Sequence, residues 1–560
     1  MSKRSQAKAY KKRIERLVKA KNILEAKKLY FEICNTTPED EQAWYTAGKY
    51  AQQLGHTEDA GRAFHRATAI NPNWSEAYQE LASCQATLGF YDSAIQSFHN
   101  CLLINPNSVE ALHQYAKLLT KLGRLHDGLD QYMKALDLNP HSVSLLADLG
   151  DLHKKLGDNK IALQHYRRAQ ALAPDNPDIY VSIGLLYRET GNAEKALENF
   201  RRFQQQLPGV NGVYEYYAAT VAEEQGEFSK AETLFEKAIQ LNPGSAKSHT
   251  AHALNLLRLG KTEKGWAEHE WRLRRDDWKQ QPGHRPIAGI AAWAGESLQG
   301  KTVLVNAEQG YGDALQFCRY IPQLAELCNK VIIYCRLPLN RILRSLPGVS
   351  GVVSQPEHLS RHRLDVCLHM MSLPYVLSSL TSKEETVLPY LSTPTPPMAM
   401  KKKMAFNGLR VGLAWRGNPS HPRNSDRSLT LSQLQPLANV ANVRFFKLQK
   451  TTRNEPQETA PDGMELVDLD EHISDFHDVA AAIGMLDLVI SVDTAVAHLA
   501  GALGKQVWTM LYFPADWRWQ VEGASTPWYP CMRLFRQQKT KQWPPVIAEL
   551  ANALEDVRAC

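Results

Sequence analysis

The sequence predicts an α-helical solenoid followed by an α/β half with parallel sheets. Prolines and glycines recur about every 34 residues through the first half of the chain, which is typical of stacked helical pairs. The recurrence stops near residue 275. Beyond it, short β-branched runs alternate with amphipathic stretches, which favours parallel strands joined by helices. A chain of 560 residues is also too long for a single hydrophobic core, so several domains are expected.

Three positions define the repeat. Prolines stand at Pro38, Pro72, Pro106, Pro140, Pro174, Pro208 and Pro243. Glycines stand at Gly55, Gly89, Gly123, Gly157, Gly191, Gly226 and Gly260. A small residue follows five positions after each glycine: Ala60, Ala94, Gly128, Ala162, Ala196, Ala231 and Gly265. We expect the glycine to end the first helix of each pair, the small residue to let the two helices approach, and the proline to end the second helix.

This pattern is that of tetratricopeptide repeats, and the first half is identified as a member of that family. Trp44, Tyr78 and Tyr180 match its aromatic position on the first helix. We expect an array over residues 1–275, made of seven full repeats and an eighth helical pair at about 246–275 that caps it. Such solenoids present a groove to a polypeptide, so the resemblance implies a protein partner. A spacer or a dimerisation surface is the alternative.

One property of peptide-modifying relatives does not carry over. The O-GlcNAc transferases, which also contain these repeats, line the groove with a ladder of asparagines. The corresponding positions in this sequence hold Thr46, Glu80, Gln114, Asp148 and Ser182. Clamping of a peptide backbone by asparagines is therefore not expected.

The second half divides into two similar lobes. A linker at 276–300 contains Pro282, Gly283 and Pro286. The first lobe, 301–395, contains predicted strands at 303–305, 331–334 and 364–368. The second, 404–560, contains predicted strands at 411–415, 445–448, 488–491 and 507–511. Helices are expected at 313–326, 430–439, 474–486 and 494–503, and the Pro- and Lys-rich stretch 393–403 separates the lobes. Two Rossmann-like lobes predict a ligand in the cleft between them.

Residues 295–302 (GESLQGKT) match the P-loop pattern, but their context does not. A P-loop follows a strand and opens directly into a helix. Here the strand at 303–305 comes after the motif instead of before it. We therefore expect an ordinary loop that leads into the first strand.

A second glycine-containing loop, residues 306–313 (NAEQGYGD), follows that strand. It fails as a dinucleotide fingerprint for two reasons. Leu315 stands where the third glycine belongs, and residues 334–336 (YCR), at the end of the next predicted strand, include no acid. Gly310 and Gly312 allow a ligand to approach the backbone. Asp313, at the start of a helix, is either a functional carboxylate or only a helix cap.

In the second lobe, residues 491–498 (SVDTAVAH) run from a buried strand into a helix. Backbone N–H groups of Thr494 and Ala495 at the helix start suit an anion. Asp493 can accept hydrogen bonds from sugar hydroxyls, and His498 either donates to a phosphate or is a buried core histidine. Arg427 and Lys450 are cations of the same lobe, and each taken alone is explained as a solvated charge.

The second half resembles glycosyltransferase family nine, the heptosyltransferase-like enzymes of GT-B fold, in the branch fused to tetratricopeptide repeats. The matching segments are GYGDALQFCRY (310–320), VGLAWRGNPSH (411–421), RSLTL (427–431), KLQK (447–450), DLVISVDTAVAHLAGALGK (487–505) and FPADWRW (513–519). With the repeats, the resemblance covers nearly the whole chain.

The resemblance implies a site as well as an activity. Inverting, metal-independent transfer of a sugar from a nucleotide donor is implied, with no cofactor and no bound metal. Asp313 matches the general base, in an acceptor loop with Gly310, Tyr311 and Gly312. The implied donor-binding residues are Asn418, Arg427, Lys450, Asp493, Thr494, Ala495 and His498. Tyr311 is bulkier than the residue many heptosyltransferases carry there, and the segment around Arg427 aligns loosely.

The combined prediction is a cytoplasmic bacterial protein glycosyltransferase whose repeats bind a polypeptide acceptor. Relatives of this architecture include flagellin glycosyltransferases that use nonulosonic acids, which favours flagellin and a CMP-nonulosonic acid. The residues themselves do not choose among CMP-, ADP-, UDP- and GDP-sugars. The alternatives are an enzyme of lipopolysaccharide or capsule assembly and a non-catalytic scaffold.

Composition is consistent with this prediction. The net charge of +6 is small for the length, so no nucleic-acid partner is expected, and we expect neither a secretory signal nor a membrane span. The first 28 residues carry eleven Lys and Arg residues, which indicates a solvated helix face or a contact with an acidic partner. Nine cysteines without a CxxC pair argue against a disulfide framework or structural zinc.

Overall fold

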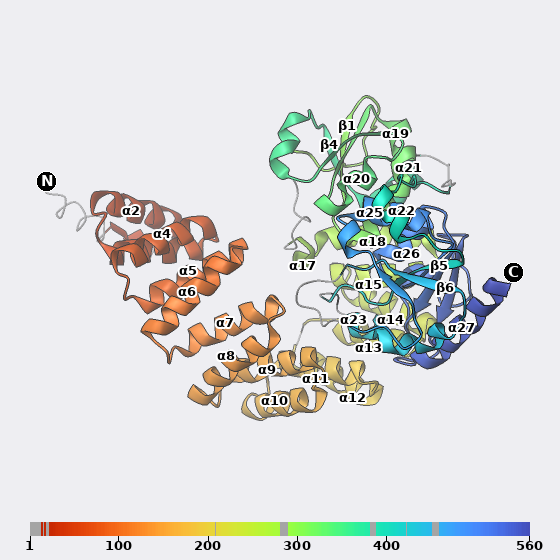
Figure 1. The fold of residues 1–560 in the computed structure, drawn as a ribbon. Coiled ribbons are helices and arrows are strands. Elements are labelled where there is room, and N and C mark those ends of the chain that lie inside the picture. Colours follow the sequence, from red (N-terminus) through yellow and green to blue (C-terminus); the bar gives the residue numbers. More distant parts are fainter. Residues whose placement is uncertain are drawn as a thin grey trace. The chain divides into compact units, whose positions relative to one another are not determined.

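The computed structural model describes residues 22–559 apart from 208, 280–288, 381–387, 420, 422 and 451–457; before residue 22 it describes only 13, 14, 16 and 17. Most of the basic N-terminal segment and the centre of the predicted linker thus lie outside the described residues. The chain divides into two compact units, Met1–Gly209 and Val210–Cys560. The first is helical, and the second combines helices with two parallel sheets (Figure 1).

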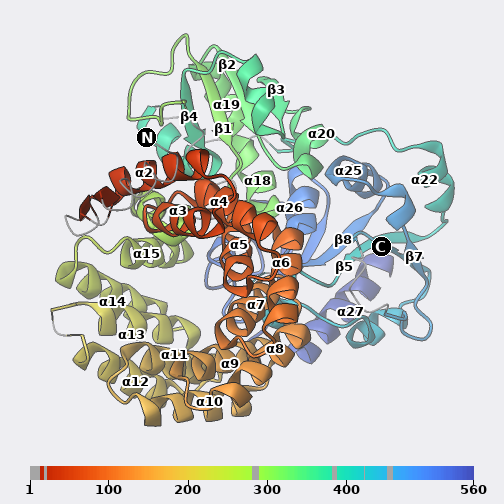
Figure 2. The ribbon, with the colours of Figure 1, turned by 90° about the vertical axis from the view of Figure 1, so that its left-hand side faces the viewer.

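The first unit is a solenoid of helical pairs. Its helices are α2 (Ile23–Thr36), α3 (Glu41–Gln53), α4 (Thr57–Ile70), α5 (Ser75–Leu88), α6 (Tyr91–Ile104), α7 (Val109–Lys121), α8 (Leu125–Leu138), α9 (Val143–Leu156), α10 (Asn159–Leu172), α11 (Pro177–Glu189) and α12 (Ala193–Gln205). Consecutive pairs stack one after another along the array (Figure 2). The seven repeat glycines all have φ between +73° and +88° and lie at the turn inside each pair, as predicted.

Close packing inside the pairs rests on small residues meeting large ones. The small residue five positions after each turn glycine is buried throughout. A second position, not noticed in the sequence, receives an aromatic ring from the paired helix. A Cβ on Gly48, Gly150 or Gly184 would lie 2.7, 2.4 or 2.5 Å from the ring of Phe64, Tyr166 or Phe200. The glycine on the first helix is the socket for the ring on the second.

The second unit begins with the last two helical pairs. They consist of α13 (Val213–Glu224), α14 (Phe228–Leu241), α15 (Ala246–Arg258) and α16 (Thr262–His269), followed by a 3-10 turn and α17 (Asp276–Lys279). These helices share a core with the sheets. Trp266 lies with its ring centroid 5.5 Å from those of both Phe317 and Trp517. Buried Arg272 donates to Glu308 at 3.2 Å and to Ser372 at 2.8 Å.

The first sheet has four parallel strands in the order β3-β2-β1-β4. They are β1 (Thr302–Asn306), β2 (Lys330–Tyr334), β3 (Val349–Val353) and β4 (Val366–His369). The helices of this part are α18 (Tyr311–Phe317), α19 (Ile321–Leu327), α20 (Asn340–Leu343) and α21 (Leu373–Leu380). Ala292, inside the predicted linker, bridges Cys367 of β4.

The second sheet has six parallel strands in the order β10-β9-β8-β5-β6-β7. They are β5 (Leu409–Ala414), β6 (Val443–Lys447), β7 (Leu466–Asp468), β8 (Leu488–Val492), β9 (Val507–Leu511) and β10 (Met532–Arg536). The helices are α22 (Met398–Lys403), α23 (Asn424–Arg427), α24 (Gln435–Ala438), α25 (Phe476–Gly484), α26 (Ala495–Ala502) and α27 (Trp543–Ala559). This is the doubly wound strand order. Strands β5 to β7 follow one another toward one edge of the sheet and β8 to β10 toward the other, so the order reverses between β5 and β8.

Most of the strands and helices predicted from the periodicity of the sequence are present in the structure. All seven predicted strands are present, and the P-loop look-alike is the loop that leads into β1, as expected. Strands β3, β7 and β10 were not predicted: β3 contains Ser350 and Gly351, and β7 has three residues. The predicted helix 313–326 is broken by a 3-10 turn at Cys318–Tyr320, just before Pro322. Part of the connector 393–403 forms α22.

Candidate functional site

The candidate site lies where strands β1 and β8 end and helices α18 and α26 begin. The two helices lie side by side in both ribbon views (Figure 1 and Figure 2). A Cβ on Gly312 would come within 2.9 Å of the His498 ring and 3.6 Å of the Ala495 Cα. Glycine at this position therefore lets α18 approach α26, and it brings the loop after β1 against the residues after β8.

Asp313 is both a helix-capping residue and a member of a charged cluster. Its Oδ2 accepts a hydrogen bond from the N–H of Gly310, the residue that precedes α18, at 2.8 Å. Its Oδ1 is paired with the Arg518 guanidinium. Burial raises the pKa of Asp313, and the positive charge of Arg518 opposes that rise. The capping interpretation of Asp313 is thus confirmed, and its pairing with Arg518 also makes it part of a charged cluster.

Arg518 is the centre of this cluster. Its Nε donates to Gln316 Oε1 at 2.6 Å and its Nη1 to Asp516 Oδ1 at 2.8 Å, while its Nη2 reaches Asp313. The guanidinium also lies 4.4 Å from the ring centroid of Trp517. Burial disfavours the charge of Asp516, yet Arg518 keeps the pKa of this carboxyl below its usual value. Neither residue was assigned a role from the sequence, although both lie in the FPADWRW segment.

Asp493 and His498 come from the end of β8 and the first turn of α26. Burial and the nearby charge of Asp516 raise the pKa of Asp493 to about 6. His498 Nε2 lies 3.9 Å from Asp493 Oδ1, and Nδ1 lies 3.1 Å from the Tyr529 hydroxyl. Burial, followed by the charge of Arg518, lowers the pKa of His498 to about 3. The imidazole is therefore neutral at neutral pH and offers a single N–H donor.

Arg427 borders the site next to the loops that follow β5 and β8. Its Nη1 donates to the backbone oxygen of Asp493 at 3.2 Å. The same guanidinium lies so close to Gly417 that a Cβ there would be 2.4 Å from Nε. Thr494 is the N-cap residue of α26, and its hydroxyl lies 3.1 Å from that of Ser491. The first N–H groups of a helix have no intrahelical acceptor, so this turn offers donors to an anion.

Two predicted residues, Lys450 and Tyr311, contact residues outside this cluster, and a third, Asn418, lies beside it. Asn418 is exposed in the loop after β5, next to Gly417. Lys450 is also exposed and donates to the backbone oxygen of Ile473 at 3.3 Å. Tyr311 packs on Phe476, with ring centroids 5.0 Å apart. The structure therefore brings together Gly310, Gly312, Asp313, Arg427, Asp493, Thr494, Ala495 and His498 from the predicted set.

Two groups of side chains among the described residues have the composition of a metal site. One is Glu232, Glu236 and His252, and the other is Asp475, His477 and Asp478. Neither includes a residue of the cluster around Asp313 and Asp493. The second group surrounds Arg341, which lies 3.0 Å from Asp478, 3.3 Å from Asp475 and 2.9 Å from His477. An arginine there already supplies the positive charge.

Comparison with known families locates the repeats. A model described as "TPR repeat" matches residues 150–191, and one described as "Tetratricopeptide repeat" matches 75–108 and 109–142. These segments are tetratricopeptide repeats. Repeats of this kind bind other proteins, so they support an interaction role for the helical array. Among the described helices, none has both the length and the apolar character needed to cross a membrane.

Individual proteins resemble this chain at lower identity. Protein FlbA of Caulobacter vibrioides (strain ATCC 19089 / CIP 103742 / CB 15) is 26% identical over 368 residues, which cover 60% of this chain and 60% of that protein. The chain thus spans less than two thirds of its relative. A tetratricopeptide repeat protein from Parabacteroides merdae is 16% identical, with 45% of this chain and 99% of that one covered and a TM-score of 0.39. Pseudomonas aeruginosa pilF is 19% identical, with 38% of this chain and 96% of that one covered and a TM-score of 0.32.

Proposed function

We propose that this protein is an inverting, metal-independent glycosyltransferase of GT-B type that transfers a sugar from a nucleotide donor to a protein. One observation carries the proposal. Asp313, which follows β1 of the first sheet, pairs with Arg518, and Arg518 also binds Asp516. Helix α18, which contains Asp313, packs on α26, and Asp493 and His498 lie at the start of α26. An acid thus lies close to a helix start bordered by Arg427.

The strand order supports the location of this site. In doubly wound sheets, ligands bind outside the carboxyl ends of the strands, where the strand order reverses. In the second sheet this point lies between β5 and β8, and the loops after these strands carry Gly417 and Asp493. Arg427 contacts both residues. A nucleoside diphosphate or monophosphate bound there would contact the Arg427 guanidinium and the first backbone N–H groups of α26.

Chemistry follows from the position of each group. Asp313 would take the proton from the acceptor hydroxyl while the hydroxyl oxygen attacks the anomeric carbon. The bond from that carbon to the phosphate oxygen would break, and its electron pair would leave with the nucleotide. Arg427, the helix start and the neutral His498 N–H would stabilise the negative charge that develops. Burial raises the pKa of Asp313, which favours its acceptance of a proton.

Arg518 gives this scheme a resting state. In the free protein its guanidinium is bound to Asp313 and Asp516, so one oxygen of the proposed base is engaged. A donor phosphate is a further anion that can compete for the same cation. Movement of Arg518 toward the phosphate would free Asp313 when the donor is bound. If Arg518 instead keeps Asp313 permanently paired, a non-catalytic scaffold is the second candidate.

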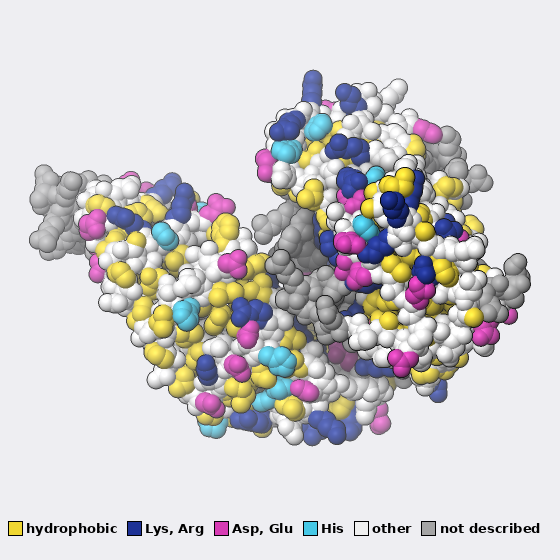
Figure 3. Space-filling view, viewed as in Figure 1, with side chains coloured by type: hydrophobic (Ala, Val, Ile, Leu, Met, Phe, Trp, Pro, Cys, Tyr) yellow, Lys and Arg dark blue, Asp and Glu magenta, His cyan; other side chains and the backbone are white. Residues whose placement is uncertain are grey.

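The helical array would recruit the acceptor. Large apolar side chains are exposed on or just before its second helices, including Phe90, Leu103, Met133 and Leu138. Figure 3 shows hydrophobic side chains recurring along the first unit on the face in view. Solenoids of this kind bind polypeptides, and these exposed side chains are available to contact one. We propose flagellin as the acceptor and a CMP-nonulosonic acid as the donor, with a lipopolysaccharide or capsule glycan as the competing acceptor.

A thermal-shift panel of CMP-, UDP-, GDP- and ADP-sugars tests donor binding. A ligand that binds only the folded state raises the melting temperature in proportion to the logarithm of its concentration. We expect one nucleotide class to raise it, and Arg427→Gln to reduce that shift. Exposed Arg13→Gln is the control. The absence of any shift across the four classes would contradict nucleotide-sugar binding.

A further inference from the structure

The boundary between the last two helical pairs contains a buried histidine without a hydrogen-bond partner. His252, on α15, has 7% of its surface exposed. Neither of its ring nitrogens has a partner among the described residues. A buried polar atom left unpaired costs free energy, so such a side chain calls for an explanation. The ring lies beside Phe235, with centroids 6.3 Å apart, which excludes water from one side.

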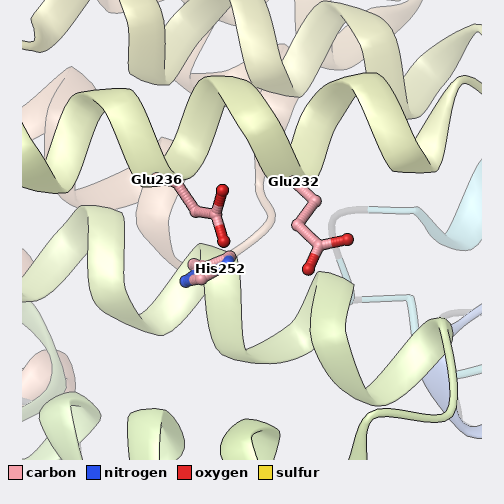
Figure 4. A group of neighbouring side chains, drawn as sticks. All are labelled: Glu232, Glu236 and His252. Carbon is pink, nitrogen blue, oxygen red and sulfur yellow. The ribbon is translucent and has the colours of Figure 1, made fainter.

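Two carboxylates from the neighbouring helix face this ring. Glu232 and Glu236 lie four residues apart on α14 and therefore project from the same side of the helix. Figure 4 shows both side chains extending from α14 toward the helix that carries His252. One ligand atom from each of the three residues lies within 4.8 Å of the other two.

The trio is not a by-product of the repeat. One repeat earlier, the corresponding positions hold Leu197, Arg201 and Ala218. None of these can bind a cation, and Arg201 would repel one. Of the two repeats compared, only the later one therefore carries all three ligands, and it carries them at this boundary. They join the last pair, which packs against the sheets, to the pair before it.

We propose that Glu232, Glu236 and His252 bind a divalent transition-metal ion, with Zn²⁺ the best match, and that this ion ties α14 to α15. One imidazole and two carboxylates form a mixed nitrogen and oxygen set of the kind that Zn²⁺ accepts. Ligand atoms around a tetrahedral zinc lie about 3.3 Å apart, from bond lengths of about 2.0–2.1 Å. Glu236 is exposed and can rotate to close the remaining distance.

Lys261 is the built-in competitor of the metal. Its Nζ lies 2.6 and 2.7 Å from the two oxygens of Glu232. A bound ion would take one of these oxygens and would face the positive charge of the lysine. Removal of that charge by Lys261→Met is therefore expected to strengthen metal binding. A purely structural ion pair would show no such gain.

The test is a zinc titration of the full chain after treatment with EDTA and desalting, followed by calorimetry or competition with a chromophoric chelator. We expect one zinc per chain and a rise in melting temperature on binding. Glu236→Gln should weaken binding about tenfold or more. Lys261→Met should bind more tightly than the unchanged protein. His252→Ala should abolish binding.

Controls separate this site from others. Exposed His126→Ala and His477→Ala, from the second candidate group, should leave the affinity unchanged. Because Glu236 is exposed, its substitution tests the site even where His252→Ala unfolds the chain. Absence of stoichiometric zinc binding would overturn the proposal. Equal affinities of Glu236→Gln and the unchanged protein, or loss of binding in His477→Ala, would overturn it as well.

Discussion

Asp313 is the residue on which the proposed chemistry depends. Replacement by Asn keeps the shape of the side chain and one acceptor for the Gly310 N–H, but it removes the proton acceptor. We expect Asp313→Asn to lower kcat by about a hundredfold or more, with donor affinity nearly unchanged. Initial rates and a donor thermal shift on the same preparation measure both. Retention of full kcat would remove Asp313 from the role of base.

Arg518 influences the charge state of the proposed base. Its positive charge opposes the rise of the Asp313 pKa, so Arg518→Gln should raise the pKa further. Because the proposed base must be ionised to accept a proton, activity should increase as pH rises through this pKa. The midpoint of the rise in kcat/KM should therefore move to higher pH in the variant. Arg341→Gln, far from Asp313 in its contacts, is the matched control, and an unmoved midpoint in Arg518→Gln would contradict the account.

The charged form of Asp493 is expected to lower the stability of the folded protein, because this carboxylate is buried in the candidate site. Burial and Asp516 raise its pKa to about 6, above the unfolded value near 3.9. Between these values the folded state binds more protons than the unfolded state, so stability falls as pH rises through about pH 4 to 6. Asp493→Asn should then stabilise the protein at pH 7, by up to about 3 kcal/mol, and have little effect at pH 4. Denaturant titrations at both pH values test this.

The control for that measurement is Asp130→Asn, which removes an exposed carboxylate. It should change stability little at either pH. A lower stability of Asp493→Asn at pH 7 than of the unchanged protein would show that the charged form of Asp493 is favoured by its surroundings.

At the scale of elements, the helical pairs depend on small residues that accept rings. Gly150 faces Tyr166 so closely that an added Cβ would lie 2.4 Å from the ring. Gly150→Ala should destabilise the first unit by about 1–3 kcal/mol, because overpacking forces the helices apart. Gly61→Ala, whose Cβ would meet Cys84 at an ordinary 3.5 Å, should be neutral or stabilising. Chemical denaturation followed by circular dichroism compares them, and equal stabilities would contradict the packing argument.

The sequence was informative about elements because periodicity is a local property. The glycine and proline positions predicted the turns of the solenoid, and β-branched runs predicted the strands. The ring sockets at Gly48, Gly150 and Gly184 were missed, since each ring comes from 16 residues away. Strand β10 was missed because Arg533 and Arg536 break its apolar run. The predicted helix 430–439 is divided into a 3-10 turn, Leu431–Leu434, and α24, because Pro436 lacks the N–H group that a continuous helix would use.

Site residues were predictable only where the chain marks them with a strand end and a helix start. Asp313 and Asp493 have that mark, and the structure brings their helices together. Arg518 has none: it lies in a short 3-10 turn, and its importance arises from contacts with Gln316 and Asp313, about 200 residues away. Lys450 illustrates the reverse, because a strand end alone did not bring it to the cluster.

At the scale of the molecule, the compact units do not coincide with the end of the repeat. The recurrence runs to about residue 275, but the second unit begins at Val210. The last two pairs belong with the sheets because Trp266 and Arg272 are buried against them. Arg423 also reaches back to Glu224 of α13 at 2.6 Å. Periodicity alone cannot reveal this, since it describes the chain and not its tertiary contacts.

Truncation separates the two boundaries. A chain starting at Val210 should fold, bind the donor and lose modification of a protein acceptor. A chain starting at residue 276 should be unstable, because removal of Trp266 and Arg272 exposes the core and leaves Glu308 buried without its cation. Circular dichroism and a donor thermal shift compare the two. Equal stability of both truncated chains would contradict the role given to the last two pairs.

The proposed reaction transfers a sugar to a protein and needs Asp313. Its most direct test is the intact mass of purified flagellin after incubation with the full chain and each of the four nucleotide-sugar classes. We expect an increment equal to one or more sugar residues with one class, absent with Asp313→Asn. No increment with any class, or the same increment with Asp313→Asn, would contradict it.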